Sequence, residues 1–191
     1  MRSRRMRVFI DFEASSLGKR SYPIEVGWVF EDGRRENMRI RPAPEWTDWD
    51  PSSEAIHGIS RTALIADGIA VEAAAERLLS ELGGHAVYAS APSWDGKWLS
   101  QLLRAAGLPR HALRLKDTEE ARAEAARTIL EAALPEAEVE PALARVLAKA
   151  TEMGRAAHVT HRAVEDAERE RQVWLQVAHL AQEEAAHRPA G

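Results

Sequence analysis

The stretch M-R-V-F-I-D-F-E-A, residues 6–14, decides how this chain is expected to fold. Its β-branched and aromatic residues predict a strand that is largely buried. Side chains along a strand alternate between its two faces, so Asp11 and Glu13 project on the same side, about 6.6 Å apart along the strand. Carboxylates this close repel each other and favour cations between them. Taken alone, the Asp-x-Glu pattern suits a polar strand end at the surface just as well.

Two more strand candidates follow the first. The segment from Pro23 to Glu31 is again β-rich, and Asp32-Gly33 predicts a hairpin turn into a third strand near Glu36–Arg41. The next segment, from Pro42 to Gly68, reads as irregular apart from a short helical stretch around Ser53–His57. The first part of the chain therefore predicts three strands of antiparallel type.

Helices and strands then alternate. Val71–Leu82 has apolar positions at helical spacing, and Ser93–Ala106 is a second predicted helix. A strand candidate precedes the second helix at His85–Ala91, and another follows it at Ala112–Lys116. This alternation after three antiparallel strands predicts an α/β fold with a mixed sheet and helices on its faces.

Alanine, glutamate, arginine and leucine dominate the last third of the chain. It predicts three helices, near Thr118–Leu134, Val139–Met153 and Ala163–Ala186. With 191 residues the chain is long enough for one domain with a sizeable core and short for two. We therefore expect a single domain over residues 1–191 with a helical C-terminal third.

Composition narrows the class of protein. The absence of cysteine excludes disulfides and thiolate metal sites, which suits a reducing cytoplasm. No apolar run approaches the roughly 20 residues of a membrane span, and the basic start leads into a strand rather than a secretory signal. We therefore expect a cytoplasmic protein without membrane association. The net charge of −4 argues against a module that merely coats nucleic acid, but it is compatible with an acidic active site.

Two further acidic elements stand out. Asp95 follows the fourth strand candidate and opens a helix, where it could equally be an acid that favours the helix dipole. His161 and Asp166 lie about 500° apart on a helix, so they converge only if His161 is in the loop before it. Taken alone, this pair also fits a surface histidine beside a solvated aspartate.

The order of these elements resembles the DEDD exonuclease superfamily in its histidine subclass, the DnaQ-like relatives of polymerase proofreading subunits, ribonuclease T and oligoribonuclease. The final segment fits the family pattern H-x-A-x-x-D throughout. The matching segments span nearly the whole chain: F-I-D-F-E-A-S-S-L-G (9–18), P-I-E-V-G (23–27), A-I-H-G-I (55–59), S-W-D-G-K-W-L (93–99) and H-R-A-V-E-D-A (161–167).

This resemblance implies a ribonuclease H-like fold with a five-stranded mixed sheet. It also implies two divalent cations, Mg²⁺ or Mn²⁺, about 3.5–4 Å apart and held by four acids. Glu13 is also expected to be a catalytic residue, and His161 is expected to deprotonate the attacking water. The expected activity is 3′→5′ exonucleolytic hydrolysis of single-stranded DNA or RNA 3′ ends, releasing nucleoside 5′-monophosphates. The four acids are Asp11, Glu13, Asp95 and Asp166.

The resemblance is less complete around the substrate. The family's Thr-Thr-Gly is replaced by Ala14-Ser15-Ser16, one residue longer before the glycine, and the usual Asn four residues before Asp95 is Ala91. His57 matches a segment near the bound nucleotide, but it also suits a helix end before a glycine cap. The residues expected to contact substrate are Phe12, Ala14, Ser15 and His57.

Other residues near the site are expected to be structural. Glu25 is interpreted as a structural carboxylate beside the site. Trp46 and Trp49 could stack on bases, but we expect them to attach a long loop to the core instead. Trp94 and Trp98 are expected to be core residues.

Three alternatives stay open on the sequence. The chain could be a catalytically weak domain of the same fold that binds nucleic acid or a partner protein, although a degenerate copy usually loses a ligand. It could also be a proofreading subunit. A stand-alone or homodimeric nuclease is expected by family analogy. The sequence does not distinguish DNA from RNA as the substrate.

Overall fold

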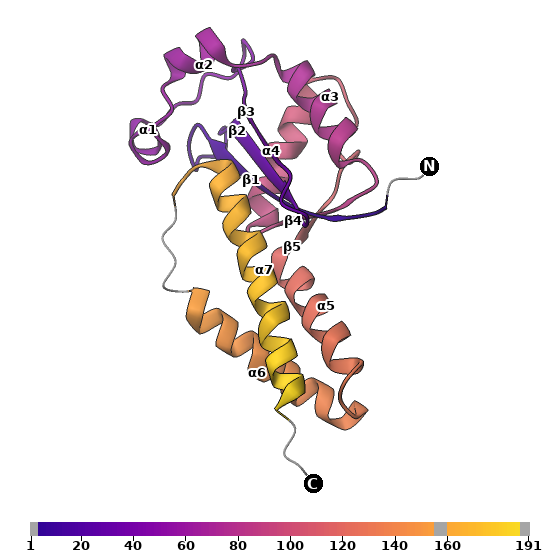
Figure 1. Cartoon of the computed structure of the whole chain (residues 1–191). Coiled ribbons are helices and arrows are strands. Elements are labelled where there is room, and N and C mark those ends of the chain that lie inside the picture. Colours follow the sequence, from indigo (N-terminus) through magenta and orange to yellow (C-terminus); the bar gives the residue numbers. More distant parts are fainter. Residues whose placement is uncertain (1–3, 155–159, 188–191) are drawn as a thin grey trace.

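The computed structural model describes residues 4–154 and 160–187. Five strands form one mixed sheet in the order β3-β2-β1-β4-β5 (Figure 1). β1 pairs antiparallel with β2 and parallel with β4, while β3 and β5 complete the two edges. The predicted mixed sheet is therefore confirmed. The strands are β1 (Arg7–Ala14), β2 (Pro23–Phe30), β3 (Arg35–Arg39), β4 (Ala86–Ala89) and β5 (Leu115–Asp117).

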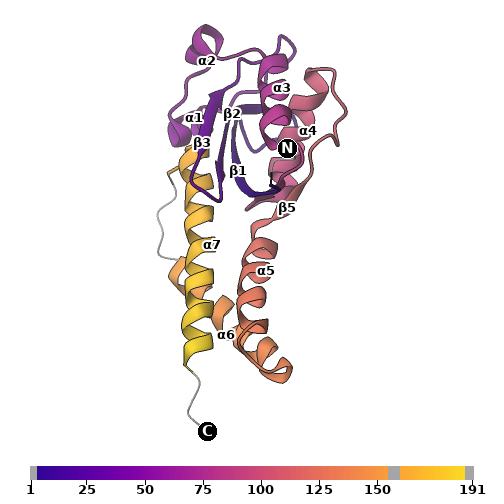
Figure 2. The ribbon, with the colours of Figure 1, turned by 45° about the vertical axis from the view of Figure 1, so that its right-hand side comes forward.

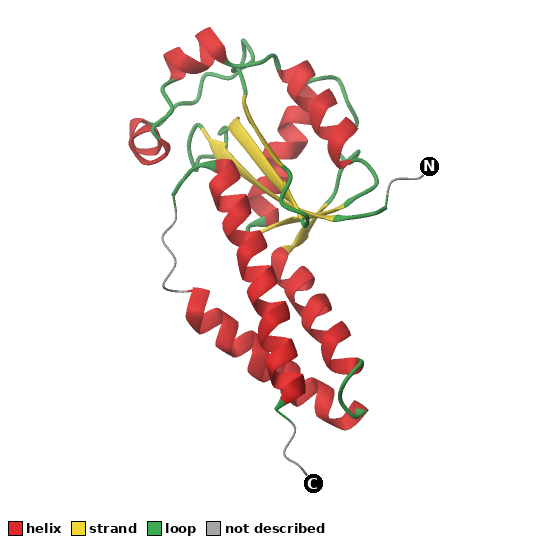
Figure 3. Cartoon of the chain, viewed as in Figure 1, coloured by secondary structure: helices red, strands yellow, loops and turns green. Residues whose placement is uncertain are grey.

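The helices follow the expected order, with one addition (Figure 3). The unexpected helix α2 lies in the segment that reads as irregular in sequence; Ser60 caps it by accepting the N–H of Ala63, at 3.1 Å. It is too short to show a helical period. The helices are α1 (Pro51–His57), α2 (Arg61–Asp67), α3 (Val71–Leu82), α4 (Pro92–Ala105), α5 (Thr118–Glu131), α6 (Glu136–Gly154) and α7 (Ala163–Ala186).

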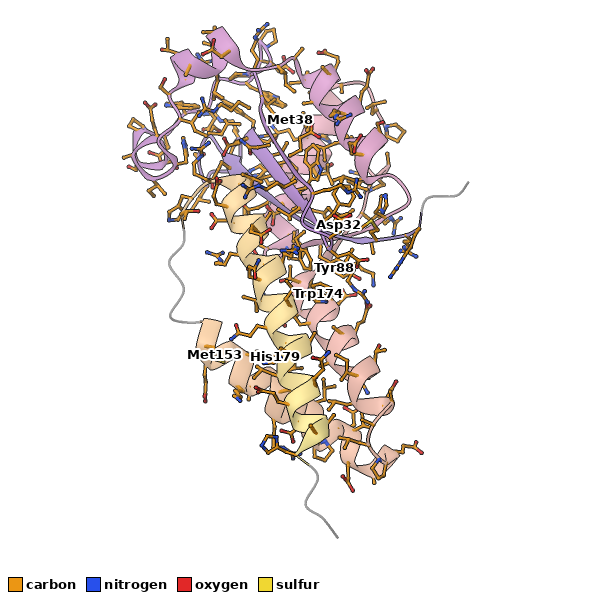
Figure 4. The ribbon with its side chains drawn as sticks, in the orientation of Figure 1. Asp32, Met38, Tyr88, Met153, Trp174 and His179 are labelled. Atoms are coloured by element: carbon orange, nitrogen blue, oxygen red, sulfur yellow. The ribbon has the colours of Figure 1, made fainter. Side chains whose placement is uncertain are left out.

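The two faces of β1 have different neighbours. Val8, Ile10 and Phe12 belong to the main core, which also contains the buried residues of α3 and α4. Phe9 points to the other face, where its ring lies 5.8 Å from that of Trp174 on α7 and 6.1 Å from that of Tyr88 (Figure 4). Asp11 and Glu13 share the alternation of Phe9, so they lie on the α7 side of the sheet.

A second apolar cluster lies among α5, α6 and α7, which extend away from the sheet (Figures 1 and 2). Its buried members include Leu130, Leu143 and Val177, one from each helix. Burial of such side chains stabilises the three-helix layer by about 1.5–3 kcal/mol each. α7 therefore belongs to both parts: its first turns cover the sheet, and its second half packs in the helical layer.

The tryptophans divide into two groups. Trp46 is buried and stacks on Tyr22 at 5.1 Å, and the indole N–H of Trp49 donates to Glu54, at 2.7 Å, so both pin the loop before α1 as predicted. The prediction of a core position for Trp94 is wrong, because this side chain is 40% exposed. Trp94 lies one turn nearer the start of α4 than the buried Trp98, and less of the molecule covers the helix at that turn.

None of the helices in residues 4–154 and 160–187 is long and apolar enough to cross a membrane.

Candidate active site

Three carboxylates from opposite ends of the sequence meet on the α7 side of the sheet. Asp11 and Glu13 come from β1, and Asp166 comes from the first turn of α7. One oxygen of each lies within 4.8 Å of the others. The same-side projection expected from strand alternation therefore places two acids where the third can join them.

Gly27 on β2 allows this approach. It pairs with Asp11 across the sheet, and a Cβ atom built on it would lie 2.2 Å from the backbone nitrogen of Val164. Such a separation is far below van der Waals contact, so a larger residue would displace the start of α7. The absence of a side chain at this position lets the helix rest directly on the strand.

Glu25 holds the same helix start by hydrogen bonds. It is fully buried and accepts from Arg162 Nε at 3.1 Å, from Arg162 Nη2 at 2.9 Å and from the backbone N–H of Ala163 at 3.2 Å. Burial alone would raise the pKa of Glu25, but hydrogen bonds from Arg162 and Asn37 lower it below its usual range. A charged, structural carboxylate thus fixes the backbone that precedes α7.

His161 lies in the loop immediately before α7. Its backbone has φ 53°, in the left-handed region that non-glycine residues seldom adopt, and the paired Arg162 follows it directly. Its exposed side chain lines the same cavity as Glu13. The structure therefore places His161 before the helix and Asp166 inside it, the arrangement that allows both to face one site.

Asp95 approaches the site from α4. It lies outside the group formed by the three acids, but its negative charge raises the pKa of Asp11. It is only 2% exposed, and its Oδ2 atom has no hydrogen-bond partner among the described residues. Burial raises the pKa of Asp95 to about 7, although the backbone groups of Ala91 and Phe12 lower it in part.

Burial and mutual repulsion both disfavour the charged form of these carboxylates. Burial, followed by the charges of Asp95 and Glu13, raises the pKa of Asp11 well above its usual range. Burial and the charge of Asp166 raise the pKa of Glu13 to about 8. Within the described part of the chain neither Asp11 nor Glu13 has an ion-pair partner, and Asp166 has only Arg169, at 3.2 Å. An all-oxygen set whose negative charge is only partly compensated fits hard divalent cations such as Mg²⁺ or Mn²⁺.

We predict that the metal-free protein loses stability as the pH rises. Carboxyls with raised pKa values in the folded state favour folding while they are protonated, and this contribution disappears as the pH passes from about 4 to about 8. The melting temperature in EDTA should fall by at least about 5 °C between pH 5.5 and pH 8.5, and millimolar Mn²⁺ should restore it at the higher pH.

Thermal melts of three proteins test this prediction. Glu13→Gln should weaken the pH dependence in EDTA, because it removes one of the titrating groups. Glu45→Gln is the matched control, because Glu45 is exposed and has no ion pair within residues 4–154 and 160–187. An equal pH dependence of the melting temperature in all three proteins would contradict the assignment of repulsion to this site.

A cavity of about 200 Å³ opens beside the carboxylates. Three of the four residues that the sequence predicts to contact substrate, Phe12, Ala14 and His57, line it. His57 is buried at the end of α1; its Nδ1 accepts the N–H of Ile59, at 3.1 Å, while its buried Nε2 has no partner among the described residues. This places the proton on Nε2 as a free donor. His57 therefore both precedes a glycine cap and faces the cavity.

The structure places Ser15 away from the cavity. Its hydroxyl accepts the N–H of Tyr22, at 3.1 Å, inside the loop after β1. Ser16 lines the cavity in its place, and its hydroxyl donates to Asp48, at 2.5 Å. The loop between Glu13 and Gly18 is one residue longer than the family's, and in it Ser16 rather than Ser15 faces the cavity. Ile56 and Trp98 also line the cavity, and their positions inside the A-I-H-G-I and S-W-D-G-K-W-L segments are the signal that could have identified them.

Solved structures share this arrangement of strands and helices. Apo exonuclease I matches with a TM-score of 0.54 and 18% identity, and the match covers 65% of this chain and 31% of that chain. The zinc-ion-bound form of the complex of E. coli exonuclease I with single-stranded DNA matches with a TM-score of 0.62 and 16% identity. The match covers 89% of this chain and 39% of that chain. The complex of E. coli exonuclease I with a dT13 oligonucleotide matches with a TM-score of 0.53 and 18% identity, and the match covers 70% of this chain and 31% of that chain.

This chain thus spans under two fifths of the length of the exonuclease I structures it matches. No protein-family model matches the sequence, and no curated protein matches it. At these identities the likeness establishes the fold, which is the ribonuclease H-like exonuclease fold, with a five-stranded mixed sheet and flanking helices.

Proposed function

We propose that this protein is a metal-dependent 3′→5′ exonuclease of the DEDD superfamily, histidine subclass. The observation that carries the proposal is the convergence of Asp11, Glu13 and Asp166 within 4.8 Å, beside an oxygen of Asp95 that has no hydrogen-bond partner among the described residues. Held by these four acids, two divalent cations, Mg²⁺ or Mn²⁺, would stabilise the negative charge that develops on the phosphoryl group.

His161 is the proposed general base. Its exposed imidazole lies at the mouth of the cavity shared with Glu13, where it can accept a proton from the attacking water. Glu13, through its charge and position, orients the same water. The pairing of Arg162 with Glu25 fixes the backbone that follows His161.

The cavity is the proposed site of the terminal nucleoside. The N–H at Nε2 of His57 can donate to a sugar or base oxygen, which would satisfy a buried donor that has no partner within residues 4–154 and 160–187. Leu17 and Ile56 line the cavity with exposed fractions of 72% and 57% and offer an apolar surface to a base. The neighbouring structures of exonuclease I with single-stranded oligonucleotides support a single strand as the substrate.

The test is a 5′-labelled oligonucleotide incubated with Mn²⁺, with Mg²⁺ or with EDTA. We expect stepwise shortening from the 3′ end in the presence of metal only, with nucleoside 5′-monophosphate as the product, and protection of a strand whose 3′ end is blocked. Matched DNA and RNA strands then establish the preferred sugar. Binding without shortening in every metal would favour a catalytically weak binding domain of the same fold.

A further inference from the structure

A groove beside the candidate active site carries positive charge in a protein that is negative overall. The groove, about 480 Å³ in volume, lies between the outer side of α4 and the loop that leads into β5. Lys97 lines it from the helix, and Arg110, His111 and Arg114 line it from the loop. The net charge of the chain is −4, so this concentration of basic groups is local.

The basic groups of the groove are not used to neutralise acids. Arg110 and Arg114 are exposed, and neither they nor Lys97 form an ion pair within residues 4–154 and 160–187. The guanidinium of Arg110 donates instead to the ring of His111, at 2.9 Å. By contrast, Lys116 on the following strand is paired with Glu120 and Glu124. Arg110 and Arg114 therefore present their positive charges to the solvent, while the ammonium of Lys97 donates to the carbonyl of Gly18, at 2.8 Å.

Helix α4 contributes residues both to the groove and to the cavity beside the carboxylates. Trp98 lines that cavity, Trp94 packs on Trp98 at 5.6 Å, and the ammonium of Lys97 lies 4.9 Å from the ring centre of Trp94. Lys97 and Trp98 also donate to the same hydroxyl, that of Ser21. The exposed Trp94 thus contacts one residue of the cavity, Trp98, and one residue of the groove, Lys97.

We propose that the groove binds the phosphodiester backbone of the strand on the 5′ side of the terminal nucleotide. Lysine and arginine side chains in a groove bind nucleic-acid phosphates through charge, and an exposed indole beside them stacks on bases of any sequence. This inference rests on the proposed function, since it assigns the path of a strand whose 3′ end lies in the cavity. The occupant is a single-stranded polynucleotide, and the contacts do not read its sequence.

The experiment compares two double variants of equal charge change. Arg110→Gln with Arg114→Gln removes two groove charges, whereas Arg4→Gln with Arg35→Gln removes two exposed charges elsewhere on the molecule. Binding of a fluorescein-labelled 15-mer is measured by anisotropy in EDTA, so that no strand is cut, at several salt concentrations. Single-stranded DNA and RNA 15-mers are used in parallel.

The groove variant should bind the 15-mer about tenfold more weakly than wild type. Its plot of log affinity against log salt should be shallower by about 1.4, since each phosphate contact to a single strand contributes about 0.7 to the slope. The control variant should lose less than twofold. In hydrolysis, the groove variant should raise KM for the 15-mer and leave the rate on a dinucleotide unchanged.

The results separate this inference from the proposed function. If the wild-type protein binds the 15-mer but shortens no strand in any metal, the nuclease proposal fails, and the groove is still judged by the two double variants. Equal affinity and equal salt slope in the groove variant and the wild type would overturn the inference. So would the absence of any oligonucleotide binding by the wild type.

Discussion

Replacing Asp11 by Asn is expected to lower the rate of 3′ shortening by on the order of 10³-fold or more while the protein stays folded. The substitution keeps the size of the side chain but removes one of the charges that would hold the cations on which transition-state stabilisation depends. Because burial and the neighbouring acids disfavour a charge on Asp11, its neutral replacement should raise the melting temperature in EDTA at pH 8.

The matched control for Asp11→Asn is Asp67→Asn, at an exposed position of α2. The control should shorten a labelled oligonucleotide at the wild-type rate. The Asp11 variant should also lose the stabilisation by Mn²⁺ that thermal melts detect in the wild type. Near-normal turnover by the Asp11 variant would refute its assignment as a metal ligand.

Replacing His161 by Ala is the second large effect that we expect. Loss of a general base typically lowers a rate by about 10²–10⁴-fold. The effect should fall on kcat and leave KM little changed, because His161 would act on the water rather than on the nucleotide. Stabilisation by Mn²⁺ should persist, since the four acids are intact.

An external base gives a sharper test of His161. Its side chain is exposed beside a cavity, so added imidazole can enter the space that Ala leaves and should restore part of the activity. His179→Ala is the control, since His179 lies far along α7 in the helical layer (Figure 4). A His161 variant with wild-type kcat would exclude the general-base role.

Much of the sheet could be predicted from local patterns. The alternation of residues 7–14 correctly predicts that Asp11 and Glu13 share a face, because the period of a strand is a local property. The sequence also correctly predicts that α7 begins at Ala163. Helix α2 escaped prediction because seven residues hold too little periodicity, and its serine cap is a common residue in loops.

The parts of the site that the sequence could not predict depend on contacts between distant segments. Nothing local to Glu25 shows that it binds Arg162, 137 residues later in the chain. The exposure of Trp94 depends on how far the rest of the molecule covers the first turn of α4. Ser16 rather than Ser15 lines the cavity because of the path of the loop after β1. The identity of the residues in this loop does not reveal which of the two serines faces the cavity.

The seating of α7 on β2 has a consequence for how the protein folds. The contact between Glu25 and Ala163 closes a loop of 138 residues, and contacts of such high sequence separation form slowly because chain entropy is lost before they form. That contact, together with the close approach of Val164 to Gly27, brings Asp166 to Asp11. In the proposed nuclease, recovery of activity after denaturation would therefore report completion of the native topology rather than formation of the sheet.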